Sequence, residues 1–214
     1  MMTQKTLCRM LAVLTVLILS ALNVLAQTTA PVPSKAATDR FASAKKDFDA
    51  GNLPKTLKAL KDVTEKEPQW IEPAFMEGDI LFILHRLDEA SAVYQTVRTL
   101  DDAQHKLTAD QRHQLISQQG ILLLLSKKYT EAVTFFEAAL KTDSNYPLYY
   151  YNLASAYAYN NDLEHSLANL KKSWELRSFL PESKDFPDPR QDAAFQKFLK
   201  DPKFQAAVAP IPAS

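Results

Sequence analysis

The stretch PAFMEGDILFILHRLDEASAVYQTVRTLD (residues 73–101) and the stretch LYYYNLASAYAYNNDLEHSLANLKKSWEL (residues 148–176) share one spacing of small and large residues. Each places a small residue, Gly78 or Ala154, within an apolar helical pattern and a large residue three positions later. Apolar residues at i, i+3 or i+4, and i+7 form one face of a helix. Each stretch therefore predicts two short helices that pack closely against each other.

The same pattern recurs along the chain at an interval of about 34 residues. Ala90 stands at this interval after Thr56, and Ser166 stands at it after Ala132. Self-similarity at such a period is typical of solenoids built from paired helices. The interval divides the chain into four segments, which are residues 37–68, 71–102, 113–145 and 147–177. The small residue of the first helix recurs in them as Ala44, Gly78, Gly120 and Ala154.

These segments resemble tetratricopeptide repeats, and the resemblance covers about two-thirds of the chain. It implies an all-α fold, a right-handed α-α superhelix of about four helix-turn-helix repeats followed by capping helices. The first repeat is the weakest match, because Ser43 and Asp47 stand where the family prefers bulky apolar residues. A polar-faced end repeat has this character. Pro68 ends the first repeat as the family pattern expects, whereas Asp102 and Ser144 stand at the equivalent places of the next two.

The interval is broken once, between Ala90 and Ala132, where about eight residues are inserted around residues 103–112. Thr108 and Gln111 have the spacing of a capping box, which predicts a helix that starts near Ala109 and is longer than its counterparts. The insertion is then expected to be a loop plus an extra helical turn. Such a loop would project from one end of the repeats and contact partners.

The N-terminal residues 1–26 predict a secretory signal peptide. Lys5 and Arg9 precede an apolar run of about ten residues, and the segment ends with small residues at Ala26. The run is too short to span a membrane comfortably. We therefore expect cleavage near Ala26, a mature chain without a membrane span, and a periplasmic or extracellular location; an uncleaved anchor is the alternative. Residues 27–36, rich in Pro, Thr, Ser and Ala, predict a disordered linker.

The C-terminal residues 178–214 predict a cap on the last repeat. Two short helical patterns, residues 191–200 and 202–208, carry phenylalanines, and Asp201 is a helix-capping residue followed by a first-turn proline. The segment resembles the closing element that follows tetratricopeptide arrays in many bacterial proteins, which covers the open face of the last repeat. Residues 209–214 are expected to be frayed.

The composition argues against nucleic-acid binding, catalysis and metal binding. The chain has 25 basic and 25 acidic residues and no basic stripe, whereas a phosphate backbone requires one. Its three glycines form no phosphate-binding loop, and its one cysteine, Cys8, lies in the predicted signal peptide. Asp101, Asp102 and His105 share helical spacing, with His113 beyond, but they are too few and too spread for a metal site. We expect no enzyme activity, no cofactor and no bound metal.

In the tetratricopeptide family the first helices of the repeats line a concave inner face. Carried over by position, the resemblance predicts an apolar, aromatic-rich surface that binds an extended or helical peptide. The residues predicted to contact a partner are Phe41, Lys45, Phe48, Glu72, Phe75, Asp79, Phe82, Leu148, Tyr151 and Tyr159. The same face also includes Asp49, Ile83, Gln114, Ser117, Ile121, Leu124, Leu125, Ser155 and Ala158.

Two interpretations of these aromatic side chains stay open. They form a usable groove, or they pack against one another and under the capping helices. The run ILLLL, residues 121–125, is apolar all round and is expected to be mostly core. The family's clamp for C-terminal carboxylates, built from Lys, Arg and Asn, is not reproduced, because Lys45 and Asn152 are isolated instances.

The sequence thus predicts a non-catalytic scaffold or adaptor that binds a peptide segment or a partner protein in the cell envelope. One alternative is an accessory subunit of an envelope enzyme or transporter. Another is a self-assembling structural protein, and the oligomeric state is left open by the residues. A small hydrolase or metal protein would need polar side chains that converge in one pocket, and the sequence shows no such cluster.

Overall fold

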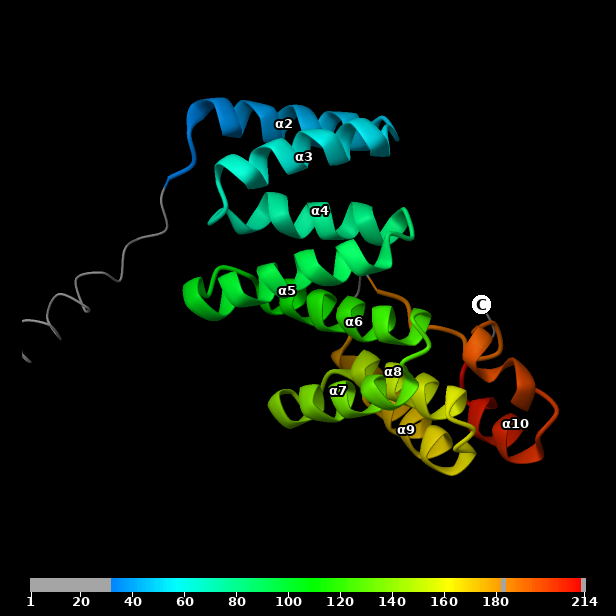
Figure 1. Ribbon diagram of the computed structural model, residues 1–214. Helices are drawn as coiled ribbons and strands as arrows, with labels where there is room; N and C mark the ends of the chain where they lie inside the picture. The colour runs from blue at the N-terminus through cyan, green and yellow to red at the C-terminus, as the bar shows by residue number, and fades with distance from the viewer. Residues whose placement is uncertain (1–31, 182–183, 213–214) are drawn as a thin grey trace, which may run out of the picture. The chain divides into compact units, whose positions relative to one another are not determined.

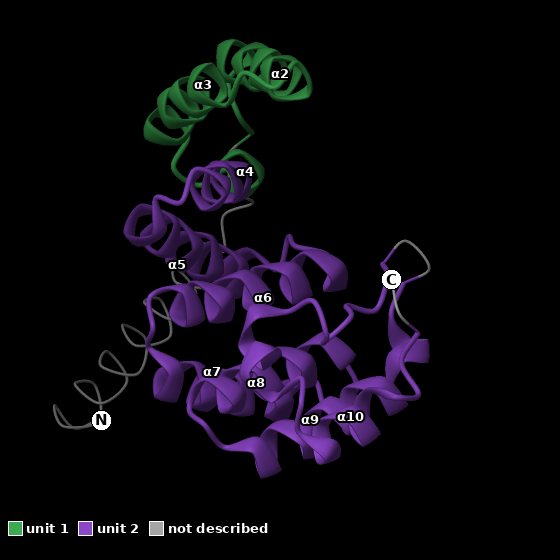
Figure 2. Ribbon diagram, turned by 90° about the vertical axis from the view of Figure 1, so that its right-hand side faces the viewer, with its two compact units in different colours: residues 1–73 green, residues 74–214 purple. Residues whose placement is uncertain are grey.

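A computed structural model of the chain describes residues 32–181 and 184–212. The predicted signal peptide and residues 27–31 of the predicted linker lie outside these residues. The described residues form helices and no strand, and they divide into two compact units, residues 1–73 and 74–214 (Figures 1 and 2). Within the described ranges, none of the helices combines the length and hydrophobicity that crossing a lipid bilayer would need.

Unit 1 contains the first helix pair, α2 (Lys35–Asp49) and α3 (Leu53–Lys66). Helix α2 begins two residues inside the segment predicted to be a linker, because the Ser34 hydroxyl accepts a hydrogen bond from the Ala37 N–H and caps the helix. The Ser34 N–H also donates to Glu67, 3.0 Å away, which ties the start of α2 to the end of α3. Only Ala37 and Ala44 of α2 are buried, so this helix has the polar character expected of an end repeat.

Unit 2 contains the following helix pairs and the C-terminal segment. Helix α4 starts at the end of unit 1, and its remaining residues belong to unit 2. The helices pair in chain order, and from α5 onward each packs on the next. They are α4 (Ile71–Ile83), α5 (Leu87–Gln104), α6 (Ala109–Leu125), α7 (Tyr129–Thr142), α8 (Pro147–Tyr159) and α9 (Leu163–Glu175). The all-α architecture of paired helices is as predicted.

The small residues of the first helices mark where a large side chain of the second helix crosses them. A Cβ atom on Gly78 would lie 2.5 Å from a ring carbon of Tyr94, and one on Gly120 would overlap the ring of Phe136. Both rings are fully buried. Glycine is required at these two positions because the ring of the second helix rests directly on the backbone of the first.

The turn inside each pair ends the first helix in the same way. One residue adopts a left-handed backbone conformation, with φ of 76° at Gly51, 55° at His85, 59° at Lys127 and 63° at Asn161. In each case the next residue donates its N–H to a carbonyl five positions back, as Lys128 does to Leu123. This is the Schellman pattern, which satisfies the last carbonyls of a helix. Glycine occupies the turn in unit 1 only, so the other three turns carry backbone strain.

The insertion predicted around residues 103–112 is mostly helical. Helix α5 extends to Gln104 and α6 begins at Ala109, which leaves a short connection. Thr108 and Gln111 form the predicted capping box, and α6 is longer than α4 and α8, as expected. The connection does not project as a free loop, because the buried carboxylate of Asp101 accepts hydrogen bonds from the Leu107 N–H and from the Arg112 guanidinium.

The C-terminal segment covers the last helix pair, as predicted. It contains short 3-10 helices, η1 (Arg177–Phe179) and η2 (Ala193–Phe198), and then α10 (Pro202–Val208), capped by Asp201. Fully buried Phe195 and Phe204 pack in one cluster with Ala154 of α8 and Leu170 of α9. Within the segment predicted as a helix over residues 191–200, residues 193–198 form a 3-10 helix instead, because their backbone N–H groups donate three residues back, as that of Phe195 does to Asp192.

The residues after α10 are packed rather than frayed, at least as far as Pro212. Ile211 is only 3% exposed. The guanidinium of Arg190 donates hydrogen bonds to the carbonyls of Val208, Ile211 and Pro212, and it is held in place by an ion pair with Asp188. The prediction of a frayed tail from residue 209 is therefore wrong for residues 209–212, because a side chain far back in the sequence satisfies their carbonyls.

Candidate functional site

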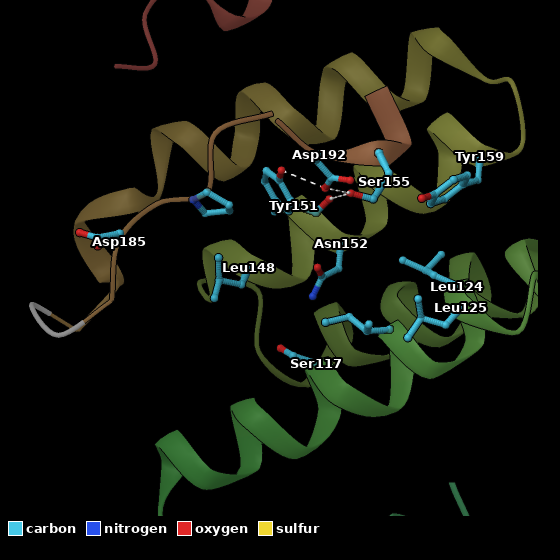
Figure 3. Close-up of a pocket in the computed structure, with 13 residues that line it drawn as sticks. Ser117, Leu124, Leu125, Leu148, Tyr151, Asn152, Ser155, Tyr159, Asp185 and Asp192 are labelled. Atoms are coloured by element: carbon cyan, nitrogen blue, oxygen red, sulfur yellow. Dashed lines mark hydrogen bonds between the residues drawn. The ribbon is translucent and has the colours of Figure 1, made fainter. Parts of the chain in front are cut away.

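Unit 2 contains a pocket of about 560 Å³. Its walls come from the inner faces of α6 and α8 and from residues 184–193, an irregular segment that turns into η2 and that we call the strap (Figure 3). The lining residues are Ser117, Ile121, Leu124, Leu125, Leu148, Tyr151, Asn152, Ser155, Tyr159, Asp185, Pro187, Asp192 and Ala193. Most of these side chains are apolar or aromatic, as in typical binding pockets for small or extended ligands.

Helix α8 supplies one wall because its two faces have different neighbours. Leu148, Asn152, Ser155 and Tyr159 repeat at helical spacing and line the pocket. The opposite face of α8 packs against α7 and α9. The side-chain amide of Asn152 extends from α8 towards α6 and makes no hydrogen bond with any residue that the structure describes (Figure 3). This amide offers a donor and an acceptor to a ligand.

Helix α6 supplies the apolar wall. Residues 121–125, predicted to be mostly core, contain one buried residue, Leu122. Ile121, Leu124 and Leu125 line the pocket, and Leu125 is 46% exposed. The prediction was wrong because α6 packs against α5 and α7 with its other face, which leaves these side chains as the lining of a cavity.

The strap closes the pocket through the carboxylate of Asp192. The Tyr151 hydroxyl donates a hydrogen bond to Asp192 Oδ2 over 3.0 Å, and the Ser155 hydroxyl lies 3.3 Å from the same oxygen (Figure 3). Burial, and then the charge of Asp192, raise the pKa of Tyr151 far above its ordinary value of 10. Tyr151 is therefore a permanent donor, held edge-on between Phe186 and Phe195. These contacts fix one wall of the pocket.

The residues predicted to contact a partner lie in different places, and only some of them line the pocket. Leu148, Tyr151 and Tyr159 line the pocket. Phe75 is only 8% exposed and packs on Tyr94, so it belongs to the core. Phe82 is half-buried and lies outside the pocket lining.

Asp79 serves a structural network instead of the pocket. It accepts hydrogen bonds from the Tyr94 hydroxyl, over 2.7 Å, and from the Gln114 amide, over 3.1 Å. Burial raises its pKa despite these hydrogen bonds. The carboxylate thus links α4, α5 and α6.

The remaining predicted contact residues belong to unit 1. Phe41 packs edge-on against Trp70, with ring centres 5.0 Å apart, and the Lys45 ammonium lies 4.8 Å from the centre of the Phe41 ring. Phe48 and Glu72 are exposed. None of these four side chains lines the pocket.

The sequence reasoning missed the strap. Asp185 and Pro187 line the pocket, yet they lie in a segment without helical periodicity, and the helical pattern over residues 191–200 did not indicate that Asp192 and Ala193 face the pocket. The one available signal is the pair of prolines at positions 187 and 189, which favour extended backbone. Proline alone does not indicate which surface an extended segment crosses.

Two of the residues considered for a metal site, Asp101 and His113, have other partners. Asp101 pairs with Arg112. His113 lies 2.7 Å from Asp143 and stacks on Tyr146 at 3.8 Å between ring centres. Among residues 32–181 and 184–212, no three His, Cys, Asp or Glu side chains group as metal ligands. These side chains tie helices to one another.

Comparison with known proteins identifies the fold. No known family model matches the sequence. The structure is similar to that of MamA from Desulfovibrio magneticus RS-1, with a TM-score of 0.58 and 22% identity over 69% of this chain and 78% of that chain. A crystal structure of MamA aligns with a TM-score of 0.56 and 15% identity, over 66% of this chain and 73% of that one. MamA is built from tetratricopeptide repeats. The chain is therefore a tetratricopeptide-repeat protein by fold.

Proposed function

We propose that this chain is a non-catalytic adaptor that binds a segment of a partner protein in the pocket between α6, α8 and the strap. The observation that carries the proposal is an apolar pocket of about 560 Å³ into which the amide of Asn152 projects, without a hydrogen-bond partner among the described residues. Apolar side chains provide binding free energy, and a few well-placed polar groups orient the ligand.

An extended segment suits this arrangement. One apolar side chain of the partner would fill the space between Leu124 and Leu125 of α6 and Leu148 of α8. The Asn152 amide would then pair with one peptide group of the partner, accepting from its N–H or donating to its carbonyl. Tyr151 and Ser155 already hold Asp192, so they shape the pocket rather than bind the ligand.

The test is a pull-down from the cell envelope in which the wild-type protein and two variants serve as bait. Leu125→Asp places a charge on the exposed apolar wall, and Asn152→Leu removes the free amide. Both should abolish capture of the partner while helical circular dichroism is retained. Ile83→Asp is the matched control, because Ile83 is 49% exposed and lies outside the pocket. Equal capture by Leu125→Asp and wild type would refute a role for the pocket.

The captured species also separates the alternatives. One large partner in fixed stoichiometry would identify an accessory subunit of an envelope enzyme or transporter. Recovery of this chain alone, with a higher mass in solution, would identify self-assembly.

We also propose that the protein is exported, with the adaptor working in the periplasm or outside the cell. The support is the N-terminal pattern of two basic residues, an apolar run and small residues before Gln27. Intact-mass measurement of the purified protein should give a chain that begins at Gln27. Replacing the small residue before the cut, Ala26→Leu, should block cleavage. A full-length wild-type chain that stays in the cytoplasmic fraction would contradict export.

A further inference from the structure

The charged side chains that line the pocket all have the same sign. Helix α8 contains no charged residue, and residues 114–125 of α6 contain none either. The charged lining residues are Asp185 and Asp192, both on the strap. The pocket therefore combines two uncharged walls with one acidic wall.

These two carboxylates have no basic partner in the part of the chain that the structure describes. Neither forms an ion pair with a described residue. The basic residues of the strap are engaged elsewhere: the Lys184 ammonium lies 3.3 Å from the Tyr146 hydroxyl, and Arg190 binds Asp188 and C-terminal carbonyls. Among the described residues, the donors to the Asp192 carboxylate are all neutral: Tyr151, Ser155 and the Ala194 N–H.

An acidic wall beside apolar walls sets the chemistry of the ligand. A cleft with charges of one sign and walls of low polarity concentrates ligands of the opposite charge. Negative charge next to an apolar cavity becomes more costly when a neutral ligand displaces water, unless the ligand brings a positive group. Asp185 is exposed at the strap, and Asp192 is fixed by its hydrogen bonds. The two carboxylates lie well apart along the strap (Figure 3), so a cation can pair with either one without displacing a protein group.

We propose that the pocket selects partner segments in which a lysine or arginine lies next to an apolar anchor residue. This inference rests on the proposed function, and it adds the class of segment that is bound. The apolar anchor occupies the space between α6 and α8, and the cationic group pairs with Asp185 or with Asp192. Segments with an acidic residue at that place are rejected by repulsion.

The experiment uses a displayed library of random peptides and the purified protein. Selected peptides should contain Lys or Arg beside an apolar residue more often than the unselected library. A fluorescein-labelled selected peptide is then compared with a copy whose Lys or Arg is replaced by Gln. Fluorescence anisotropy should show about tenfold weaker binding of the Gln copy, and the difference should shrink at high salt.

Charge variants of the protein test the same pairing from the other side. Asp185→Asn with Asp192→Asn should remove the difference in affinity between the basic peptide and the Gln peptide. Asparagine at position 192 can accept from Tyr151 or from the Ala194 N–H but not from both, so the readout is the ratio of the two affinities. Glu164→Gln with Glu175→Gln removes the same charge from exposed positions of α9 outside the pocket and should change nothing. Asp185→Lys alone should shift selection towards acidic peptides.

Distinct outcomes separate the inference from the proposed function. If peptides bind and Leu125→Asp abolishes binding, but the Asn variants bind as wild type does, the charge inference is wrong and the pocket function stands. If no peptide binds, or if Leu125→Asp has no effect, both are wrong. Dimers that form through the pocket and exclude peptides would identify a second copy as the occupant and overturn the inference.

Discussion

At the scale of single residues, Gly120 decides how the third helix pair packs. A Cβ atom at this position would overlap the ring of Phe136, which is fully buried. Alanine normally favours a helix over glycine by about 1 kcal/mol. Here we expect Gly120→Ala to lower the free energy of unfolding by about 1–3 kcal/mol, because overpacking outweighs helix propensity. Urea unfolding followed by circular dichroism measures the difference.

A second substitution tests the cause of that loss. Phe136→Leu removes the ring atoms that the new Cβ would meet. The double variant Gly120→Ala with Phe136→Leu should therefore lose less free energy of unfolding than the two single variants lose in sum. Simple additivity would show that the contact is not responsible.

Asp101 gives unit 2 a pH dependence with a definite sign. Burial would raise the pKa of this carboxyl, but hydrogen bonds from Arg112 and from the Leu107 N–H outweigh burial and hold its pKa below the ordinary 3.8. Because the pKa is lower in the folded state, the ionised carboxylate stabilises the fold at pH values above the unfolded-state pKa. This stabilisation is lost as the pH falls through the folded-state pKa. We expect Asp101→Asn to cost about 1–3 kcal/mol at pH 7.

The pH profile distinguishes the ion pair from a simple packing role. The difference in free energy of unfolding between wild type and Asp101→Asn should stay constant from pH 7 to about pH 5 and shrink below about pH 4. A difference that is the same at pH 3 and pH 7 would rule out the charge of Asp101 as its source.

At the scale of helices and turns, three of the four turns inside helix pairs carry a strained residue. Lys127 has a φ of 59° and is exposed. A left-handed conformation costs an L-residue about 1–2 kcal/mol. Glycine avoids this cost, but it loses more conformational entropy on folding, which offsets part of the gain. We expect Lys127→Gly to raise the free energy of unfolding by about 0.5–1 kcal/mol. Thermal and urea unfolding both measure the gain.

The neighbouring position is the control. Ser126 has a φ of −80° and needs no glycine. Ser126→Gly should therefore destabilise the protein by about 0.5–1 kcal/mol. If Lys127→Gly and Ser126→Gly change the free energy of unfolding in the same direction, backbone strain at residue 127 is not the cause.

The elements show which parts of the fold could be predicted from the sequence. Helix pairing, the capping box at Thr108 and the cap at Asp201 depend on residues close together in the chain, and local patterns predict such features well. The strap could not be predicted in the same way. It is held by the hydrogen bond from Tyr151 to Asp192, between residues 41 positions apart, and its backbone has no periodicity.

The candidate site was predicted in part for the same reason. The α6 and α8 walls of the pocket follow from the repeat pattern, which places Leu148 and Tyr159 on an inner face. The pattern does not show where a neighbouring ring buries a residue of that face. Phe75 is core because Tyr94 packs on it, and Asp79 is a network residue because Tyr94 and Gln114 donate to it.

At the scale of the whole molecule, the C-terminal segment stabilises the last helix pair. Fully buried Phe195 packs with Phe204 and against Tyr151 of α8. We expect Phe195→Ala to cost about 3–5 kcal/mol. In repeat proteins each element contacts only its neighbours. Hydrogen exchange should therefore accelerate in α8, α9 and α10 and remain unchanged in α2 and α3.

Phe179→Ala is the matched control, because this phenylalanine is 60% exposed. It should leave hydrogen exchange unaltered in every helix. Faster exchange in α2 and α3 of the Phe195→Ala protein would contradict a local cap and indicate that the two units unfold together.

The late position of the cap in the chain has a consequence for biosynthesis. Ala154 and Ala158 of α8 and Leu170 of α9 are buried by Phe195, Phe204 and Val208, which follow them by several dozen residues. Any process that delivers the chain from its N-terminus leaves this apolar surface bare until the last residues emerge. The interval between synthesis of α9 and synthesis of α10 is when the nascent chain is most open to aggregation and to chaperone binding.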